Sequence, residues 1–566
     1  MWVRAIDSAN PSGLLRAPAE PGLAIAIALL VACHHSPRPI AIAPLPRDAY
    51  AYYLRGKLAL YRDDAGAAAR ELQAAAKAAP DQPMIVVELA RALTKAKQEM
   101  PARDVLVEAR RRWPDHAQVW LASGEVLEQI GDKPAAIAAY RRAIELEPDE
   151  ERAYLGLART QIVAEDQRGA ERTLRALVKR VPASVDGHYR LAQRLDQRGD
   201  RNAAAAELRA VLEREPDHLD ARIDLARTLR RLGKLGEAVD QTRSAFDRAG
   251  QPLDIAEELF WLLCEADDRQ GAIDLLTLLD DDRSDADALA TVAQFQRVLG
   301  RTPESRLLAE HIKATDPDAS AIVHAETDLA EGLAAQAAAR ALTIADKSPR
   351  FLEARRVAIY ALLAARDVPR ALSLVTALRA SRADDVDLVY LEANVRIEAG
   401  DAKTANELAH KLEPFWQARL AEQQGDSQRA LQILEPYVRT HHDQPSALNL
   451  AGYLLAERHE RLADAERYLA QARDLQPGDP QILDSWGWLL FQRGRVREAI
   501  RALDHASRFA PREPEILVHL AAAWASDGSP RYAAELLDRA ARLTPSPAVA
   551  RRIDALRAKL VLPSKP

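Results

Sequence analysis

The feature that most constrains this chain is a ladder of prolines and alanines with a period of 34 residues. The prolines lie at Pro80, Pro114, Pro148, Pro182 and Pro216. The alanines keep the same phase at Ala68, Ala102, Ala136, Ala170, Ala204, Ala238 and Ala272. Near the other end of the chain the ladder returns as Ala465, Ala499, Ala533, Pro477, Pro511 and Pro545. Chance does not hold two residue types in register over so many copies, so the period indicates one small unit stacked many times.

One copy of the unit, residues 118–148, reads as two amphipathic helices joined by a turn at Gly131. Small residues at Gly124 and Ala136 allow the two helices to approach closely, and the bulky Tyr140 fills the space beside them. Such a pair cannot bury both of its faces alone, so neighbouring pairs must stack. The 34-residue helix–turn–helix period resembles the tetratricopeptide repeat. The expected fold is therefore all-α, a right-handed superhelical solenoid of about fifteen repeats with a C-terminal capping helix.

Changes in the regularity of the ladder predict the organisation of the chain. The expected segments are a lipoprotein signal peptide at 1–32, a lipidated cysteine and tether at 33–46, an N-terminal array at 47–250, a degenerate middle at 251–443, a C-terminal array at 444–545, and a capping helix with a tail at 546–566. In the middle, Ala371, Ala405 and Ala430 are the expected second-helix landmarks. Their variable spacing fits either a bend in the solenoid or simple divergence.

Composition and charge exclude several classes of protein. The chain is 48% hydrophobic but only 5% aromatic, and alanine and leucine, both good helix formers, supply most of the apolar share. A net charge of −6 over 566 residues argues against a dedicated nucleic-acid binder. Charge is uneven, because nine acidic residues and two arginines fall between Glu265 and Asp287, whereas the C-terminal end is basic. We interpret these runs as solvated faces between helices.

The N-terminal region contains an apolar segment that ends at a cysteine. Ten apolar residues, Leu23 to Ala32, precede Cys33, which suits the apolar core of a signal peptide but is too short to span a bilayer. The segment from Leu30 to Cys33 resembles the lipobox of bacterial lipoproteins, which implies that Cys33 is acylated. His34, not aspartate, follows it, so the resemblance implies an outer-membrane anchor facing the periplasm. An ordinary signal peptide is the alternative, and the charged stretch before the apolar core favours a translation start near Leu14.

Two segments near the C-terminus are more specific than the general repeat. They are residues 447–458, ALNLAGYLLAER, and residues 482–495, ILDSWGWLLFQRGR. With the lipobox they resemble large tetratricopeptide lipoproteins of the Gram-negative outer membrane, which act as periplasmic scaffolds. One subgroup tethers carboxy-terminal processing proteases that trim cell-wall hydrolases, and the resemblance implies such partners. The alternative is a pilotin-like assembly factor that binds subunits of an envelope pilus or secretion machine.

A partner is expected along the concave wall, which the first helix of each repeat lines. The ninth position of successive first helices gives a largely basic stripe: Lys57, Arg91, Glu125, Arg159, Gln193 and Arg227. Its cations, Lys57, Arg91, Arg159 and Arg227, would suit an acidic segment, or they are merely solvated. In the C-terminal array the inner positions are Asn449, Tyr453, Asp484, Trp488 and Phe491. Exposed aromatics are typical interaction anchors, although Trp488 and Phe491 could instead pack on each other or on neighbouring repeats.

The sequence offers no catalytic constellation. It lacks a glycine-rich phosphate loop, a nucleophile elbow, a zinc-protease helix and spaced cysteine pairs. Residues 441–443, His-His-Asp, could hold a metal, but a plain surface turn is the preferred interpretation. Cys264 lies in an apolar run and is expected to be a buried small hydrophobe. We therefore expect no enzymatic activity, no cofactor and no metal, with protein partners and no nucleic acid.

Overall fold

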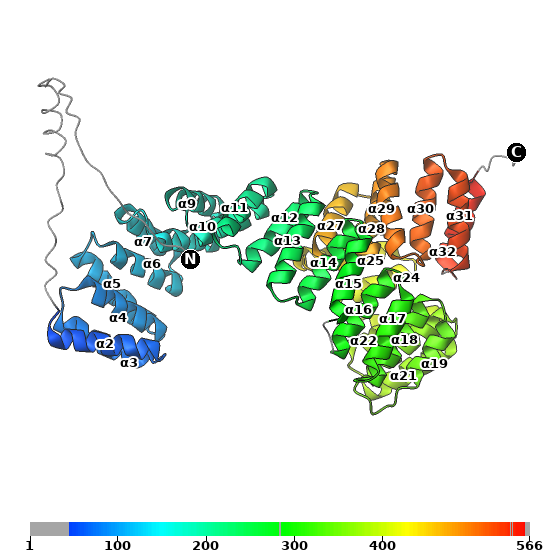
Figure 1. Cartoon of the computed structure of the whole chain (residues 1–566), viewed down its shortest axis with the longest axis horizontal. Coiled ribbons are helices and arrows are strands. Elements are labelled where there is room, and N and C mark those ends of the chain that lie inside the picture. The colour runs from blue at the N-terminus through cyan, green and yellow to red at the C-terminus, as the bar shows by residue number, and fades with distance from the viewer. Residues whose placement is uncertain (1–44, 282–284, 544, 546, 561–566) are drawn as a thin grey trace, which may run out of the picture. The chain divides into compact units, whose positions relative to one another are not determined.

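The computed structural model describes residues 45–281, 285–543, 545 and 547–560. Within these ranges it consists of 31 helices, α2 to α32, with no strand (Figure 1). The thirty helices α2 to α31 form fifteen helix–turn–helix pairs and α32 follows alone, which confirms the expected all-α repeat solenoid. The predicted signal peptide, Cys33 and most of the tether lie outside the described residues. No described helix is long and apolar enough to cross a membrane.

The chain divides into two compact units, one ending at Ala170 (unit 1) and one beginning at Glu171 (unit 2). The boundaries drawn from repeat regularity, at 250 and 443, follow the sequence pattern and do not coincide with this division. Unit 1 contains α2 (Arg47–Tyr61), α3 (Ala65–Ala78), α4 (Pro83–Lys95), α5 (Glu99–Arg112), α6 (Ala117–Ile130), α7 (Lys133–Leu146) and α8 (Glu151–Val163). The division falls within α9 (Gln167–Arg180).

The small residues of the repeat are required by close packing in unit 1. Tyr140 of α7 is 1% exposed. A Cβ atom on Gly124 of α6 would lie 2.6 Å from its ring, and one on Gly156 of α8 would lie 2.5 Å from it. Both distances are too short for a side chain, so the ring occupies space that only glycine leaves free. This confirms the packing predicted for Gly124 and Tyr140.

Unit 2 begins with regular repeats and continues through the predicted degenerate middle. This part of unit 2 contains α10 (Val185–Arg198), α11 (Arg201–Arg214), α12 (Leu219–Arg231), α13 (Leu235–Arg248), α14 (Leu253–Glu265), α15 (Arg269–Asp281), α16 (Ala286–Val298), α17 (Thr302–Ile312), α18 (Pro317–Ala330), α19 (Ala334–Leu342), α20 (Phe351–Ala364), α21 (Val368–Ser381), α22 (Val386–Glu398), α23 (Ala402–Ala409), α24 (Pro414–Gln423) and α25 (Ser427–Thr440). Ala371, Ala405 and Ala430 are fully buried in α21, α23 and α25, as predicted for second-helix landmarks.

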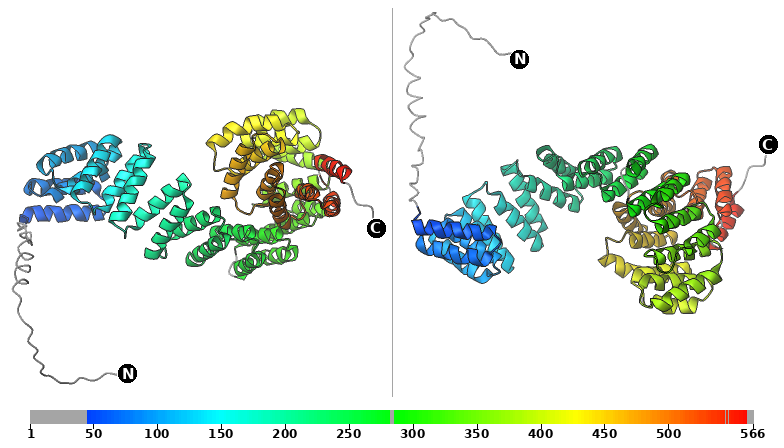
Figure 2. Two further views of the ribbon diagram at one scale, coloured as in Figure 1. Left: turned by 90° about the horizontal axis from the view of Figure 1, so that it is seen from above. Right: turned by 60° about the horizontal axis from the view of Figure 1, so that its bottom comes forward.

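The C-terminal repeats pack against helices near the start of unit 2. Their helices are α26 (Pro445–Glu457), α27 (Leu462–Leu475), α28 (Pro480–Gln492), α29 (Val496–Phe509), α30 (Pro514–Ser526), α31 (Pro530–Arg542) and α32 (Pro547–Lys559). Phe509 of α29 belongs to the same buried apolar cluster as Phe260 and Phe295 of α14 and α16. Figure 2 shows α27 to α29, in yellow and orange, beside the green helices of this unit. On one side of this contact are α12, α14 and the turn after α14; on the other are α27, α29 and the turn before α28. We call these contacts the closure interface.

The closure interface is polar as well as apolar. Arg230 of α12 donates hydrogen bonds to the carbonyl oxygens of Arg473, at 2.6 Å, and Asp474, at 2.7 Å. It also forms an ion pair with Glu265, at 3.3 Å. Arg508 of α29 pairs with Asp267. Two acids of the run interpreted as a solvated face are therefore paired: Glu265 with Arg230 and with Arg473 of α27, and Asp267 with Arg508 of the basic C-terminal end.

Candidate partner-binding groove

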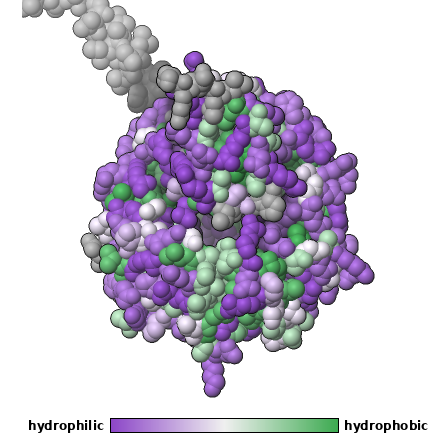
Figure 3. Space-filling model, turned by 90° about the vertical axis from the view of Figure 1, so that its right-hand side faces the viewer, coloured by the Kyte–Doolittle hydropathy of each residue, from purple (hydrophilic) through white to green (hydrophobic). Residues whose placement is uncertain are grey.

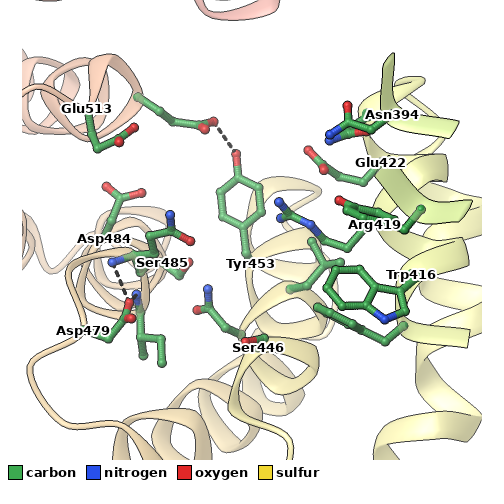
Figure 4. A pocket seen from close by; sticks show the side chains of 18 of the residues that line it. Asn394, Trp416, Arg419, Glu422, Ser446, Tyr453, Asp479, Asp484, Ser485 and Glu513 are labelled. Carbon is green, nitrogen blue, oxygen red and sulfur yellow. Dashed lines mark hydrogen bonds between the residues drawn. The ribbon is translucent and has the colours of Figure 1, made fainter. Parts of the chain in front are cut away.

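A groove of about 560 Å³ runs along the inner wall of unit 2. Its lining side chains come from the first helices of six successive repeats, α20, α22, α24, α26, α28 and α30, and from the turns that precede α28 and α30. Figure 4 shows side chains from the two walls facing one another across Tyr453. Figure 3 looks onto the C-terminal end of the chain, where a central hollow is bordered by both hydrophilic and hydrophobic residues.

The groove combines carboxylates with aromatic rings. Six acidic residues line it, Asp387, Glu422, Asp479, Asp484, Glu513 and Glu515, against the arginines Arg356 and Arg419. Its aromatic residues are Tyr360, Tyr390, Phe415, Trp416 and Tyr453. The rings of Tyr390 and Trp416 lie 4.3 Å apart and those of Phe415 and Trp416 lie 4.7 Å apart, which makes one aromatic cluster. The wall is therefore acidic, with flat apolar surfaces between the charges.

Tyr453 and the last helix meet at one end of the groove. The Tyr453 hydroxyl donates a hydrogen bond to Glu515 at 3.0 Å (Figure 4) and accepts one from Arg552 of α32 at 3.2 Å. Arg552 also donates to Glu515 and to Glu457, each at 2.8 Å. Burial and the neighbouring Glu515 raise the pKa of Tyr453, so the phenol keeps its proton and remains a donor. The C-terminal helix thus places a guanidinium among carboxylates of the inner wall.

Other acidic side chains of the groove are partly desolvated. Burial raises the pKa of Glu422, and Arg419 offsets this only in part. Burial also raises the pKa of Asp479, although it accepts hydrogen bonds from the backbone N–H groups of Gln481, at 2.8 Å, and Ile482, at 3.0 Å. A raised carboxyl pKa means that the charged form is destabilised. A cation brought into the groove would relieve that cost.

Asp484 lines the groove and is held from behind by His519 of α30. The side chain of Asp484 is 9% exposed and that of His519 is 1% exposed, and their closest atoms lie 2.9 Å apart. Burial alone would lower the pKa of His519, but attraction and hydrogen bonding to Asp484 outweigh burial and raise it. The pair fixes the position of a carboxylate that sequence analysis placed on the inner wall.

The five inner positions predicted in the C-terminal array divide into two groups. Asn449, Tyr453 and Asp484 line the groove, as expected. Trp488 and Phe491 do not line it, which corrects the expectation that they do. Their rings stack on each other at 5.1 Å, and Trp488 also stacks on His519 at 4.3 Å. Its indole N–H donates to Glu457 at 2.7 Å. These two residues pack between repeats, and a role for any of the five in partner binding stays a prediction.

The stripe predicted to be largely basic alternates in sign, because each of its cations is paired with a glutamate of a neighbouring first helix. Lys57 lies 2.6 Å from Glu88, which also binds Arg91 at 3.1 Å. Arg91 also reaches Glu125, at 3.4 Å. Arg159 binds Glu128 through two hydrogen bonds of 2.5 and 2.7 Å, and Arg227 binds Glu258 through two of 2.9 Å.

Unit 1 has a groove of its own, of about 710 Å³. Side chains of both charges line it, among them Arg91, Glu125, Glu128 and Arg159. Binding of an acidic segment by the stripe remains an untested prediction.

The remaining residues singled out in the sequence, Cys264 and the His441 turn, lie in the core and on the surface respectively. Cys264 is fully buried, as expected, and burial raises the pKa of its thiol. His441 is exposed and stacks on Tyr437, at 4.1 Å between ring centres. Among residues 45–281, 285–543, 545 and 547–560, no group of three or more histidine, cysteine or acidic side chains is arranged to hold a metal ion.

Sequence comparison agrees with the repeat geometry. Two family profiles described as tetratricopeptide repeat match the chain, one at residues 102–151, 417–480 and 485–547 and the other at residues 197–252. The chain carries tetratricopeptide repeats. A curated relative, the TPR repeat-containing protein PA4667 of Pseudomonas aeruginosa, is 33% identical over 84 residues. That match spans 15% of this chain and only 14% of the relative's length.

Several solved structures are similar over parts of the solenoid. MamA of Desulfovibrio magneticus is 20% identical, over 31% of this chain and 99% of MamA, with a TM-score of 0.28. PilF of Pseudomonas aeruginosa is 15% identical, over 37% of this chain and 96% of PilF, with a TM-score of 0.32. A chain of the Naa15/Naa10 complex bound to HypK-THB is 14% identical, over 90% of this chain and 96% of that one, with a TM-score of 0.30. Because tetratricopeptide repeats bind protein partners, this chain is a protein-interaction scaffold.

Proposed function

We propose that this protein is a lipid-anchored scaffold on the periplasmic side of the outer membrane. In this proposal the groove of unit 2 holds a carboxy-terminal processing protease or one of its cell-wall hydrolase substrates. The observation that carries the proposal is the groove itself, which has concave geometry over six first helices and aromatic and charged side chains ready for contact. The anchor rests on the resemblance of the segment ending at Cys33 to a lipobox.

The place of the family-like segments supports the same assignment. Residues 447–458 and 482–495, which resemble the adaptor lipoproteins, form most of α26 and α28. These two helices supply Asn449, Tyr453 and Asp484 to the groove wall. The part of the sequence that is most like the adaptors therefore coincides with one wall of the groove.

The anchor is tested by metabolic labelling of cells that express the full chain with radioactive palmitate. The protein has only two cysteines, so Cys33→Ser is expected to abolish incorporation, whereas the buried Cys264→Ser serves as the matched control and should keep it. Label that persists in Cys33→Ser would contradict lipidation at this residue.

The partner is tested by chemical crosslinking in intact membranes, followed by mass spectrometry of complexes purified through the full chain. We expect a carboxy-terminal processing protease and cell-wall hydrolases among the crosslinked proteins. Recovery of pilus or secretin subunits in their place would contradict the adaptor role and support the assembly-factor alternative.

A further inference from the structure

A cation supplied by the chain itself lies at the edge of the groove, bound to two of its lining residues. Arg552 extends from α32, which follows the last repeat, and makes hydrogen bonds to Tyr453, Glu457 and Glu515. Its side chain is 35% exposed, so the guanidinium lies at the edge of the groove and not in a sealed core. Arg552 therefore shows which chemistry this wall accepts: a planar cation held by carboxylates and by a phenol.

Further carboxylates of the same wall remain available. The side-chain carboxylates of Glu422 and Glu513 form no hydrogen bond or ion pair with another residue of the described chain, although their backbone groups take part in the helices and turns. Of the two lining arginines, Arg356 is paired with Asp387 at 3.2 Å, and Arg419 lies beside Glu422 without neutralising the wall. With Glu457, Arg552 and the His519 that pairs with Asp484 included, seven carboxylates face three arginines and one histidine, which leaves an excess of negative charge.

The aromatic cluster adds a second reason to expect a cationic ligand. The faces of Tyr390, Trp416 and Phe415 lie together on one wall, and Tyr360 is 44% exposed although it lines the groove. Guanidinium groups stack on such rings, and the aliphatic part of a lysine or arginine side chain packs against them. Nucleic acids and anionic lipid surfaces carry the wrong charge for this wall.

We propose that the groove of unit 2 binds an extended, basic segment of a partner protein, with arginine or lysine side chains seated on Glu422, Glu513 and the aromatic cluster. This inference rests on the proposed scaffold function and specifies the chemistry of the partner. First helices of neighbouring repeats lie about 8–10 Å apart, and an extended chain advances about 3.3 Å per residue. A bound segment therefore meets a new helix about every third residue, which favours cations spaced three apart.

The probe is a fluorescein-labelled peptide of four Arg-Ser-Ser triplets, titrated with the full chain and followed by fluorescence anisotropy at low salt. The control peptide contains four Glu-Ser-Ser triplets. We expect saturable binding of the basic peptide, weakened by added salt, and binding of the acidic peptide at least about tenfold weaker. Equal binding of both peptides, or preference for the acidic one, would overturn the inference.

Variants locate the binding. The double variant Glu422→Gln and Glu513→Gln is expected to lower the affinity for the basic peptide about tenfold. Neutral glutamine removes a charge that the desolvated wall already disfavours, so folding should be preserved. The double variant Glu407→Gln and Glu535→Gln removes the same charge from exposed positions on α23 and α31 and should leave affinity unchanged. Equal loss in both double variants would show that net charge alone is being measured and would contradict the groove site.

Arg552→Ala removes a positive charge from the edge of the groove, whereas the previous variants removed negative charge. It releases Glu457 and Glu515, so the basic peptide is expected to bind more tightly. Weaker binding after this substitution would contradict recognition through charge. If the basic peptide fails to bind while crosslinking in membranes still recovers the protease, the inference about partner chemistry is wrong and the scaffold function stands.

Discussion

Arg230→Ala is expected to release the closure interface and to destabilise unit 2 strongly. The side chains of Arg230 and Glu265 are only 6% and 9% exposed. Removal of the guanidinium leaves the carbonyl oxygens of Arg473 and Asp474 without their donors and strips Glu265 of one of its two cations. Breaking a buried pair by deleting one partner typically costs about 3–5 kcal/mol.

Arg227→Ala, one helical turn earlier on α12, is the matched control. Arg227 pairs with Glu258, but their side chains are 50% and 25% exposed, so its loss should cost about 0–1 kcal/mol. Hydrogen–deuterium exchange of the full chain, read in peptides from α12, α14 and α27, measures the free energy of local opening. Faster exchange of equal size in both variants would contradict a special role for the closure interface.

Gly478→Ala is expected to produce the second large effect. Gly478, in the turn before α28, has a φ of +75°, and a Cβ atom there would collide with the backbone carbonyl oxygen of Trp261 in α14. The left-handed backbone and the collision together are expected to destabilise the closure interface by about 2–4 kcal/mol.

Gly494→Ala separates the two contributions. Gly494 has nearly the same φ, +74°, but no atom lies within 4 Å of a Cβ built there, so only the backbone penalty of about 1–2 kcal/mol is expected. Combining Gly478→Ala with Arg230→Ala should destabilise less than the sum, because either change alone opens the same interface. Full additivity in exchange measurements would contradict a shared interface.

The fold could be predicted from the sequence because its determinants are local and repeated. The 34-residue ladder fixes helix, turn and helix, and even in the irregular middle Ala371, Ala405 and Ala430 lie buried at the predicted positions. The closure interface could not be predicted in this way. Its partners are separated by more than 200 residues, as Arg230 is from Asp474. The only signal was the acidic run from Glu265 facing a basic C-terminal end, which we interpreted as solvated surface.

The site was predicted in part, for a similar reason. The position of a residue within the first helix of its repeat correctly predicted that Asn449, Tyr453 and Asp484 lie on the groove wall. It failed for Trp488, because His519 of the next repeat offers its ring a stacking partner. The basic stripe was an incomplete description, since it considered one helical position alone. A glutamate lies 31 residues after Lys57 and after Arg227, and that spacing is a signal that the sequence does contain.

Site-specific photo-crosslinking tests the central claim, that partners bind inside the groove of unit 2. A benzoylphenylalanine is introduced at Tyr360, which lines the groove and is 44% exposed, or at Tyr532 of α31, which is 40% exposed and does not line it. After irradiation of intact cells, crosslinked products are identified by mass spectrometry. The account predicts that one defined envelope partner is captured from Tyr360 and not from Tyr532. Capture of that partner from Tyr532 alone would contradict it.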